Sequence, residues 1–218
     1  MPPGSEQVRR PDLLPICKVL YCVGLQYSPK ERSRALNSED CMSQAEIAGG
    51  AVTPPNELPS KGHRLHDFGL MSAIGPIIRL SDYRGRYNLV LIFTDDRSES
   101  KELLSDVASQ YPRIKNEESE VLAVMRSSRE HAAEAKQQLE LPYPVLADED
   151  GCVHREVGAV DLQGRASGAV YITDRFGEVF GLYRTRDGQL LPGVPDILNW
   201  LEFINSQCPE CEPPEWPA

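Results

Sequence analysis

The distribution of apolar and polar residues divides the chain into an irregular beginning and a regular remainder. Before Gly62, proline, serine, glycine and charged residues interrupt every hydrophobic period, as in "AGGAVTPPNELPSKG". A segment of this composition buries too little apolar surface to offset the entropy lost on ordering. We therefore expect a loosely structured arm over residues 1–61, one folded domain over 62–206 and a proline-rich tail over 207–218.

Within the expected domain, strand-like and helix-like periods alternate. "NLVLIF", Asn88 to Phe93, is a near-continuous apolar run, which is typical of a strand buried on both faces. The other expected strands are residues 66–70, 75–80, 120–125 and 143–148, and the two halves of 168–184 around a turn at 174–177. The expected helices lie around residues 103–111, over 127–139 and 195–204, and within 149–159. Strand and helix alternation implies parallel strands joined by crossover helices, and the hairpin adds antiparallel strands. The pattern predicts an α/β fold with a mixed β-sheet and helices on both faces.

Two of the expected helices begin with polar pairs that can satisfy free backbone N–H groups. Asp96 with Glu99, and Ser127 with Glu130, have the three-residue spacing of a capping box. These pairs predict where the helices start.

Charge and hydropathy narrow the partners that the chain can have. The net charge is −10 and the pI is about 4.9, which argues against generic binding to nucleic acid or anionic lipid. The most apolar early run, Leu13 to Leu25, is shorter than a membrane span, is interrupted by Lys18 and is not followed by a small-residue cleavage site. We therefore expect a soluble, cytoplasmic protein. The chain has no glycine-rich phosphate loop, and no cofactor is expected.

Three stretches of the domain resemble a known family. They are "HDFGL…IIRLSDYRGRYNLVLIF", "LPYPVLADEDGCVHREVGAVD" and "VYITDRFGEV". Together they are similar to the redoxin group, the AhpC/TSA or peroxiredoxin family, over about Gly62 to Ile204. The resemblance implies a thioredoxin-like fold of the peroxiredoxin type, an antioxidant or oxidoreductase activity, and a thiol reductant or protein partner.

The chain departs from this family at the position of the family's reactive cysteine. Peroxiredoxins carry a Pro-x-x-x-Thr/Ser-x-x-Cys motif after the first core strand, and related reductases carry Cys-x-x-Cys there. In "TDDRSESKELL", Ser98 and Lys101 occupy the dithiol positions, and Glu102 lies near the peroxidatic position. No cysteine lies between Cys41 and Cys152. The usual nucleophile is therefore absent from this loop.

The groups that normally assist that nucleophile are missing as well. The fold places a cis-proline or an arginine just before the strand of "VYITD", and Gly168 falls at that point. Arg165 is close in sequence and could reach the site instead. Asp95, Asp96 and Glu99 would repel a thiolate, although carboxylates at a helix start stabilise the helix. The loop therefore predicts a well-capped structural helix.

"CPEC", Cys208 to Cys211, is the one chemical motif that remains. It can be a redox dithiol, half of a zinc site completed by Cys17 and Cys22 or by a second subunit, a structural disulfide, or a pair without a chemical role. The pair follows the end of a helix, where the dipole raises a thiol pKa and favours a cation. These alternatives stay open.

The remaining candidate residues carry weaker signals. Cys152 stands at the start of a short helix, two residues before His154, an arrangement that can activate a thiol. The family has no catalytic residue at this position, so we interpret Cys152 as a buried or incidental cysteine. The four histidines, His63, His66, His131 and His154, are scattered without ligand spacing and are interpreted as structural or surface residues.

Two hypotheses about function follow. The first is a divergent redoxin, a thiol-disulfide oxidoreductase or antioxidant protein whose catalytic residues are Cys208 and Cys211, with or without Cys152. The alternative is a catalytically inactive redoxin-fold protein that binds a partner or serves as a scaffold.

Overall fold

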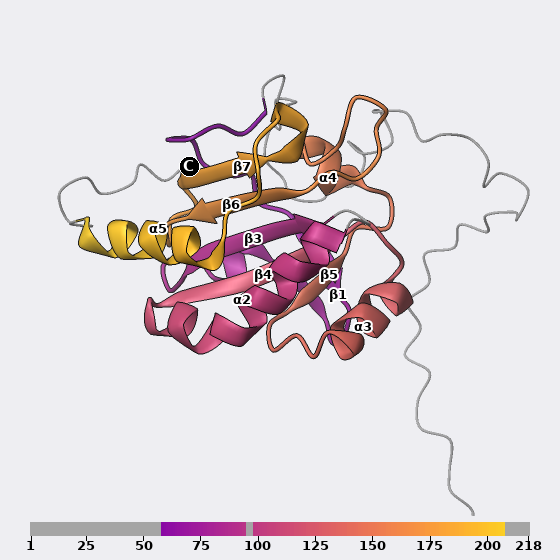
Figure 1. Ribbon diagram of the computed structural model, residues 1–218, viewed down its shortest axis with the longest axis horizontal. Helices are drawn as coiled ribbons and strands as arrows, with labels where there is room; N and C mark the ends of the chain where they lie inside the picture. Colours follow the sequence, from indigo (N-terminus) through magenta and orange to yellow (C-terminus); the bar gives the residue numbers. More distant parts are fainter. Residues whose placement is uncertain (1–57, 95–97, 208–218) are drawn as a thin grey trace, which may run out of the picture. The chain divides into compact units, whose positions relative to one another are not determined.

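The computed structural model describes residues 58–94 and 98–207, the regular part of the chain (Figure 1). In chain order its strands and helices are β1 (Gly69–Ser72), β2 (Ile77–Arg79), β3 (Asn88–Thr94), α2 (Ser98–Asn116), β4 (Ser119–Met125), α3 (Arg129–Gln138), β5 (Val145–Ala147), α4 (Cys152–Glu156), β6 (Ala169–Thr173), β7 (Val179–Arg184) and α5 (Val194–Ser206). Two short 3-10 helices, η2 (Leu80–Asp82) and η3 (Thr185–Asp187), follow β2 and β7.

The strands of this part of the chain form one mixed sheet in the order β2-β1-β5-β4-β3-β6-β7. The apolar run predicted to be a buried strand is β3, whose seven residues are all buried. It pairs in parallel with β4 and antiparallel with β6. The carboxyl ends of the three parallel strands meet at one edge, because Thr94 pairs with Met125, and Met125 with Ala147.

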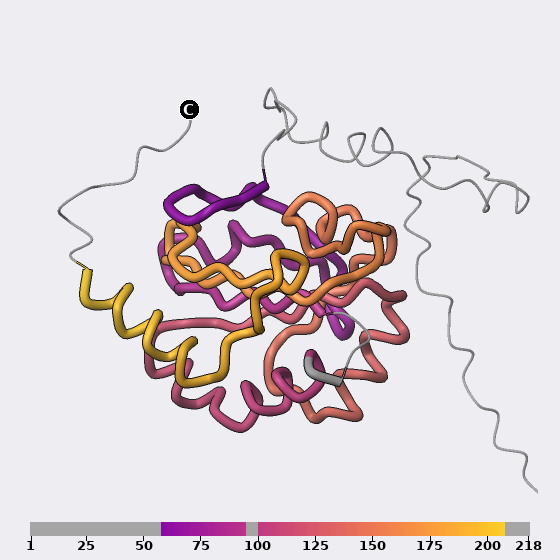
Figure 2. The backbone as a smooth tube through the Cα atoms, turned by 45° about the horizontal axis from the view of Figure 1, so that its top comes forward, coloured from indigo at the N-terminus to yellow at the C-terminus, as the bar shows by residue number. Residues whose placement is uncertain are grey.

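Side chains alternate between the two faces of the sheet, as they do on any strand. Val90 and Ile92 of β3 point into one core, which α2, α3 and α5 cover. Leu91 and Phe93 point into a second core, which contains Val153 of α4 and residues from the segment before β1. Figure 2 shows α2 and α5 on one side and the segment that begins at residue 58 on the other. Both faces are covered, so the predicted α/β fold is confirmed.

The structure corrects two predicted element boundaries. The expected strand at 66–70 is shifted, because Asp67 accepts the Ser81 backbone N–H (2.9 Å) and the chain becomes a ladder strand only from Gly69. Helix α3 is capped by Ser128, which accepts the His131 backbone N–H, and not by Ser127. The second correction concerns which of two neighbouring serines satisfies the backbone at the helix start, and a spacing rule does not settle this.

The predicted arm and tail lie largely outside the described residues, so their boundaries stay predictions. Residues 58–61 are described: the Pro59 carbonyl accepts a hydrogen bond from the buried Arg184, and Ser60 Oγ lies 2.8 Å from His63 Nδ1.

In the described part of the chain, no helix combines the length and apolarity that crossing a bilayer demands.

Candidate functional site

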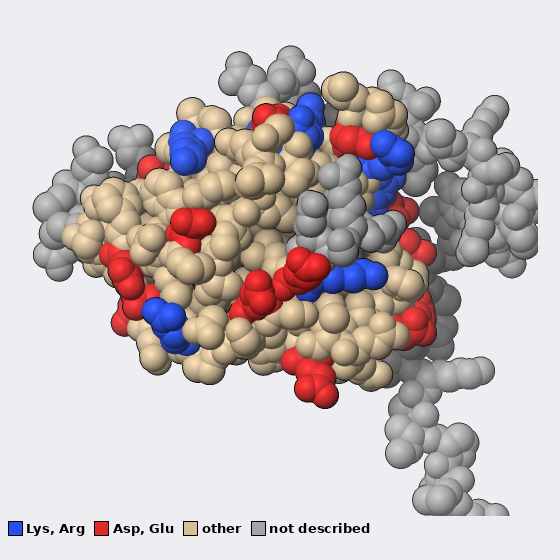
Figure 3. Space-filling model, in the orientation of Figure 1, with Lys and Arg blue, Asp and Glu red and all other residues tan. Residues whose placement is uncertain are grey.

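The carboxyl edge of β3, β4 and β5 is where the resemblance places a reactive thiol. Beyond Thr94 the chain passes through residues 95–97, outside the described ranges, and enters α2 at Ser98. Lys101 and Glu102, which occupy cysteine positions of the family motifs, lie in the first turns of α2, and both are exposed. Figure 3 shows acidic side chains along the surface over α2. The start of α2 therefore offers exposed charged groups in place of a sheltered nucleophile.

Packing restricts the position at which the family has an arginine or a cis-proline. Gly168 is buried directly before β6, and a Cβ atom built on it would lie 3.1 Å from Leu191 Cδ1 and 3.4 Å from Thr185 Cγ2. A separation of 3.1 Å is tight for two carbon atoms, so any side chain here must displace Leu191. Glycine is therefore what this packing accepts.

Arg165 does not take over the role of the missing cation. Its guanidinium bonds the Asp161 carboxylate at 2.8 Å, and the Arg165 side chain is 74% exposed. Asp161 also accepts the backbone N–H groups of Gln163 and Arg165, so the pair closes a surface turn. The sequence left open that Arg165 reaches the site; in the structure this local turn satisfies its charge at the surface.

Restoring the arginine should cost stability. Gly168→Arg is expected to lower the free energy of unfolding by about 1–3 kcal/mol, because the new side chain overpacks the space of Leu191. Urea denaturation measures the change, and adding Leu191→Ala should recover part of it. Leu190→Arg, at a side chain that is 88% exposed, is the matched control and should leave stability unchanged. Equal costs for the two arginine variants would contradict the packing explanation.

A buried acid–imidazole pair lies next to the carboxyl edge. Asp148, directly after β5, accepts hydrogen bonds from the His154 backbone N–H (2.8 Å) and from its Nδ1 (2.7 Å). Burial alone would raise the pKa of Asp148, but these hydrogen bonds lower it below its ordinary value. An ionised carboxylate only accepts, so Nδ1 carries the proton. The pair therefore fixes both the His154 tautomer and the position of α4.

The other ring nitrogen of His154, Nε2, has different surroundings. Its side chain is fully buried, and Nε2 has no hydrogen-bond partner among the described residues. The imidazole meets the Phe93 ring edge-on, with centroids 5.3 Å apart. The sequence interpretation of His154 as a structural residue fits these contacts, but it missed Asp148. The available signal was a carboxylate at the end of a strand, one turn before a short helix.

Cys152 is the one cysteine in the described ranges, and its sulfur is disulfide-bonded. It is the first residue of α4, as expected, and is half-buried. The Arg155 guanidinium lies 3.2 Å from its Sγ. The Arg126 side chain covers the preceding Gly151 and donates to the Gly164 carbonyl at 2.5 Å. Cys152 is therefore neither a simple core residue nor an incidental one, which corrects the interpretation from sequence.

Cys208 and Cys211 lie outside the described residues, so their catalytic role stays a prediction. The structure describes what precedes them: α5 ends at Ser206, and Gln207 leaves the helix with extended backbone angles (φ −73°, ψ 142°).

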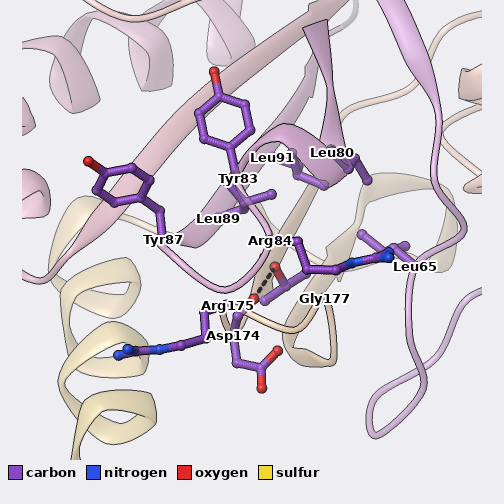
Figure 4. A pocket seen from close by; sticks show the side chains of 11 residues that line it. Leu65, Leu80, Tyr83, Arg84, Tyr87, Leu89, Leu91, Asp174, Arg175 and Gly177 are labelled. Carbon is purple, nitrogen blue, oxygen red and sulfur yellow. Dashed lines mark hydrogen bonds between the residues drawn. The ribbon is translucent and has the colours of Figure 1, made fainter. Parts of the chain in front are cut away.

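A small cavity lies at the opposite end of β3 (Figure 4). Leucine side chains line it, with Tyr83, Tyr87 and the turn between β6 and β7. Its volume of about 20 Å³ has room for about one water molecule. Asp174 belongs to this turn and accepts the Phe176 and Glu178 backbone N–H groups, so it holds the hairpin together. The cavity cannot hold a substrate.

Comparisons with known proteins agree with the fold described above. The family model described as "AhpC/TSA family" matches residues 61–180. The chain is 26% identical to "Peroxiredoxin Q, chloroplastic" of Oryza sativa subsp. japonica over 163 residues, which cover 71% of this chain and 75% of that protein.

Solved structures are similar in fold. Peroxidoxin BcpB from Mycobacterium tuberculosis is 17% identical, with a TM-score of 0.58, and the match covers 67% of this chain and 98% of that one. AhpC from the same organism is 18% identical, with a TM-score of 0.60, and the match covers 69% and 95% of the two chains. The matched residues include the sheet from β1 to the start of β7, so the chain belongs to the AhpC/TSA family.

Proposed function

We propose that this protein is a thiol-disulfide oxidoreductase of the AhpC/TSA family that works through Cys208 and Cys211. The observation that carries the proposal is a Cys-x-x-Cys pair that begins two residues after the end of α5, on a fold whose usual thiol position holds exposed charged residues. Dithiols of this spacing are suited to reversible disulfide exchange. A peroxidase reaction at the start of α2 has no nucleophile, because no cysteine lies between Cys41 and Cys152.

The proposed reaction transfers two electrons and two protons. One thiolate of the pair attacks a sulfur of the substrate disulfide, forms a mixed disulfide and releases one substrate thiolate, which takes a proton. The second thiolate then attacks the mixed disulfide, releases the other substrate thiol and closes the Cys208–Cys211 disulfide. A small-molecule thiol or a dithiol protein reduces this disulfide again, and is itself oxidised. The protein partner is therefore a thiol reductant.

Cys152 supports redox chemistry in this chain. We place the protein in the cytoplasm, where persistent disulfides are rare and those that form are mostly catalytic or redox-sensing. A disulfide at Cys152 is then better explained by thiol exchange than by a need for structural cross-linking. The core supports the same view, because both faces of the sheet are already covered by apolar side chains.

A second candidate function rests on the packing beside Gly168 and on the charges at the start of α2. Leu191 fills the space next to Gly168, and α2 begins with exposed charged residues, so the family's reaction centre is absent. A redoxin fold without that centre can serve as a binding or scaffold protein. This candidate predicts no stoichiometric oxidation of any cysteine by peroxide or by disulfide substrates.

Thiol titration combined with mass spectrometry distinguishes the two candidates. We expect the fully reduced protein to form a Cys208–Cys211 disulfide when a disulfide substrate is added, with one substrate disulfide consumed for each chain. Zinc measured in the same sample, before reduction, tests whether the pair instead holds a metal. Thiols that stay reduced in the presence of a tenfold excess of substrate would rule out the oxidoreductase and leave the binding function.

A further inference from the structure

Four aromatic side chains form a continuous surface where α5 crosses β7. Phe180 and Tyr183 come from β7, and Trp200 and Phe203 from α5; we call them the aromatic strip. The Phe203 ring lies 6.2 Å from the Phe180 ring and 5.9 Å from the Trp200 ring, centroid to centroid. Trp200 Nε1 donates to Tyr183 Oη at 2.9 Å. The strip is therefore ordered by its own contacts.

The strip is open to an additional contact. Phe203 is 48% exposed, and the other three side chains are only partly buried. The surface over α5 in Figure 3 carries few charged side chains. The Lys61 ammonium lies beside the strip, 4.7 Å from the centroid of the Trp200 ring. An exposed aromatic surface with a cation beside it is typical of a binding site for an apolar, acidic segment.

The geometry of α5 directs the end of the chain toward this surface. Trp200, Phe203 and Gln207 are spaced i, i+3 and i+7, so they follow one face of the helix. Gln207 has backbone angles (φ −73°, ψ 142°) that match a polyproline II helix. Its Nε2 atom donates to the Phe203 carbonyl at 3.4 Å. The chain therefore leaves α5 beside Phe203 and already in the conformation that proline favours.

The residues that follow have the composition of a ligand for such a surface. The tail "CPECEPPEWPA" contains four prolines, Trp216 and three glutamates. Proline-rich segments dock on aromatic surfaces as polyproline II helices, because little conformational entropy is lost. Eleven residues in this conformation extend about 34 Å at about 3.1 Å per residue. Helix α5 is about 20 Å long, at about 1.5 Å per residue, so the tail can run back along it.

We propose that residues 208–218 dock on the aromatic strip of their own chain. The prolines and Trp216 contact Phe203 and Trp200, and the glutamates lie toward Lys61. The tail and the strip belong to one molecule, so the contact is intramolecular and independent of protein concentration. It does not require Cys208 or Cys211 to be redox-active.

Fluorine NMR of the full chain labelled with 5-fluorotryptophan tests this docking, with one fluorine on Trp216 in the tail and one on Trp200 in the strip. The protein has two tryptophans, and Trp216→Phe assigns their resonances. In the native protein we expect the Trp216 resonance to differ from its position in urea and to be shielded from the solvent isotope shift. Phe203→Ala should move it at least halfway toward the position in urea, while far-UV circular dichroism stays unchanged.

The matched control is Leu162→Ala, which removes another exposed apolar side chain, 91% exposed in the loop before β6, and should leave the Trp216 resonance in place. The double variant Cys208→Ser with Cys211→Ser should also keep the docked resonance, which separates this proposal from the oxidoreductase. A native Trp216 resonance at the position in urea would overturn the docking. So would a resonance that Phe203→Ala does not move, or one that becomes shielded only as protein concentration rises, since the tail would then bind a second copy.

Discussion

Replacing Cys208 and Cys211 together by serine should abolish the reduction of disulfide substrates. The expected loss in turnover is at least about 100-fold, because a serine hydroxyl cannot replace a thiolate as nucleophile or as resolving group. The two single variants should behave differently. The variant that keeps the attacking thiol should accumulate the mixed disulfide, because it lacks the second thiol that resolves it, and the variant that lacks the attacking thiol should form none. Reduction of insulin, followed by turbidity with dithiothreitol as the reductant, measures the turnover.

Cys152→Ser tests whether turnover needs Cys152 in addition to the C-terminal pair. If Cys208 and Cys211 form the whole exchange pair, this variant keeps its turnover, although its disulfide is lost. Loss of turnover in Cys152→Ser would contradict the assignment to the C-terminal pair alone. A serine double variant that still reduces insulin would contradict it completely. Turnover with peroxide should be at background in every variant, because α2 starts without a cysteine.

The fold could be predicted from the sequence because its strongest signals are local. The run Leu89 to Phe93 is apolar without interruption, and it lies in the fully buried β3. The hairpin turn at Asp174 to Gly177 is set by an aspartate that accepts backbone N–H groups within its own turn, and by a glycine with φ of 87°. Periodicity and turn chemistry act over a few residues, so a single sequence reveals them.

The environment of the site could not be predicted, because it depends on contacts between distant segments. Gly168 is enclosed by Leu191, and no spacing rule connects these two positions. Arg184 is buried against Tyr171 and the Pro59 carbonyl, although its sequence context is that of a surface strand end. The sequence alone shows that the nucleophile is absent. The structure was needed to show that Leu191 packs against Gly168.

The buried pair of Asp148 and His154 should be worth several kcal/mol to the fold. Asp148→Ala removes the acceptor of two hydrogen bonds and leaves the His154 Nδ1–H buried without a partner. Breaking a buried pair by removing one member costs about 3–5 kcal/mol of the free energy of unfolding. Urea denaturation at pH 7 measures this loss. Glu149→Ala, at the exposed neighbouring carboxylate, should change stability by no more than about 0.5 kcal/mol.

The same pair predicts how the loss depends on pH. The folded-state pKa of Asp148 is lowered, so its contribution is fully present above the unfolded pKa of about 3.9 and is lost as pH falls through the folded pKa. The gap in stability between the wild type and Asp148→Asn should therefore be constant from pH 7 to pH 5 and narrow below about pH 4. A gap that is unchanged at pH 3 would contradict an ionised Asp148. Adding His154→Phe to Asp148→Ala should cost less than the sum of the two single changes, because the second substitution removes the nitrogen that the first leaves unpaired.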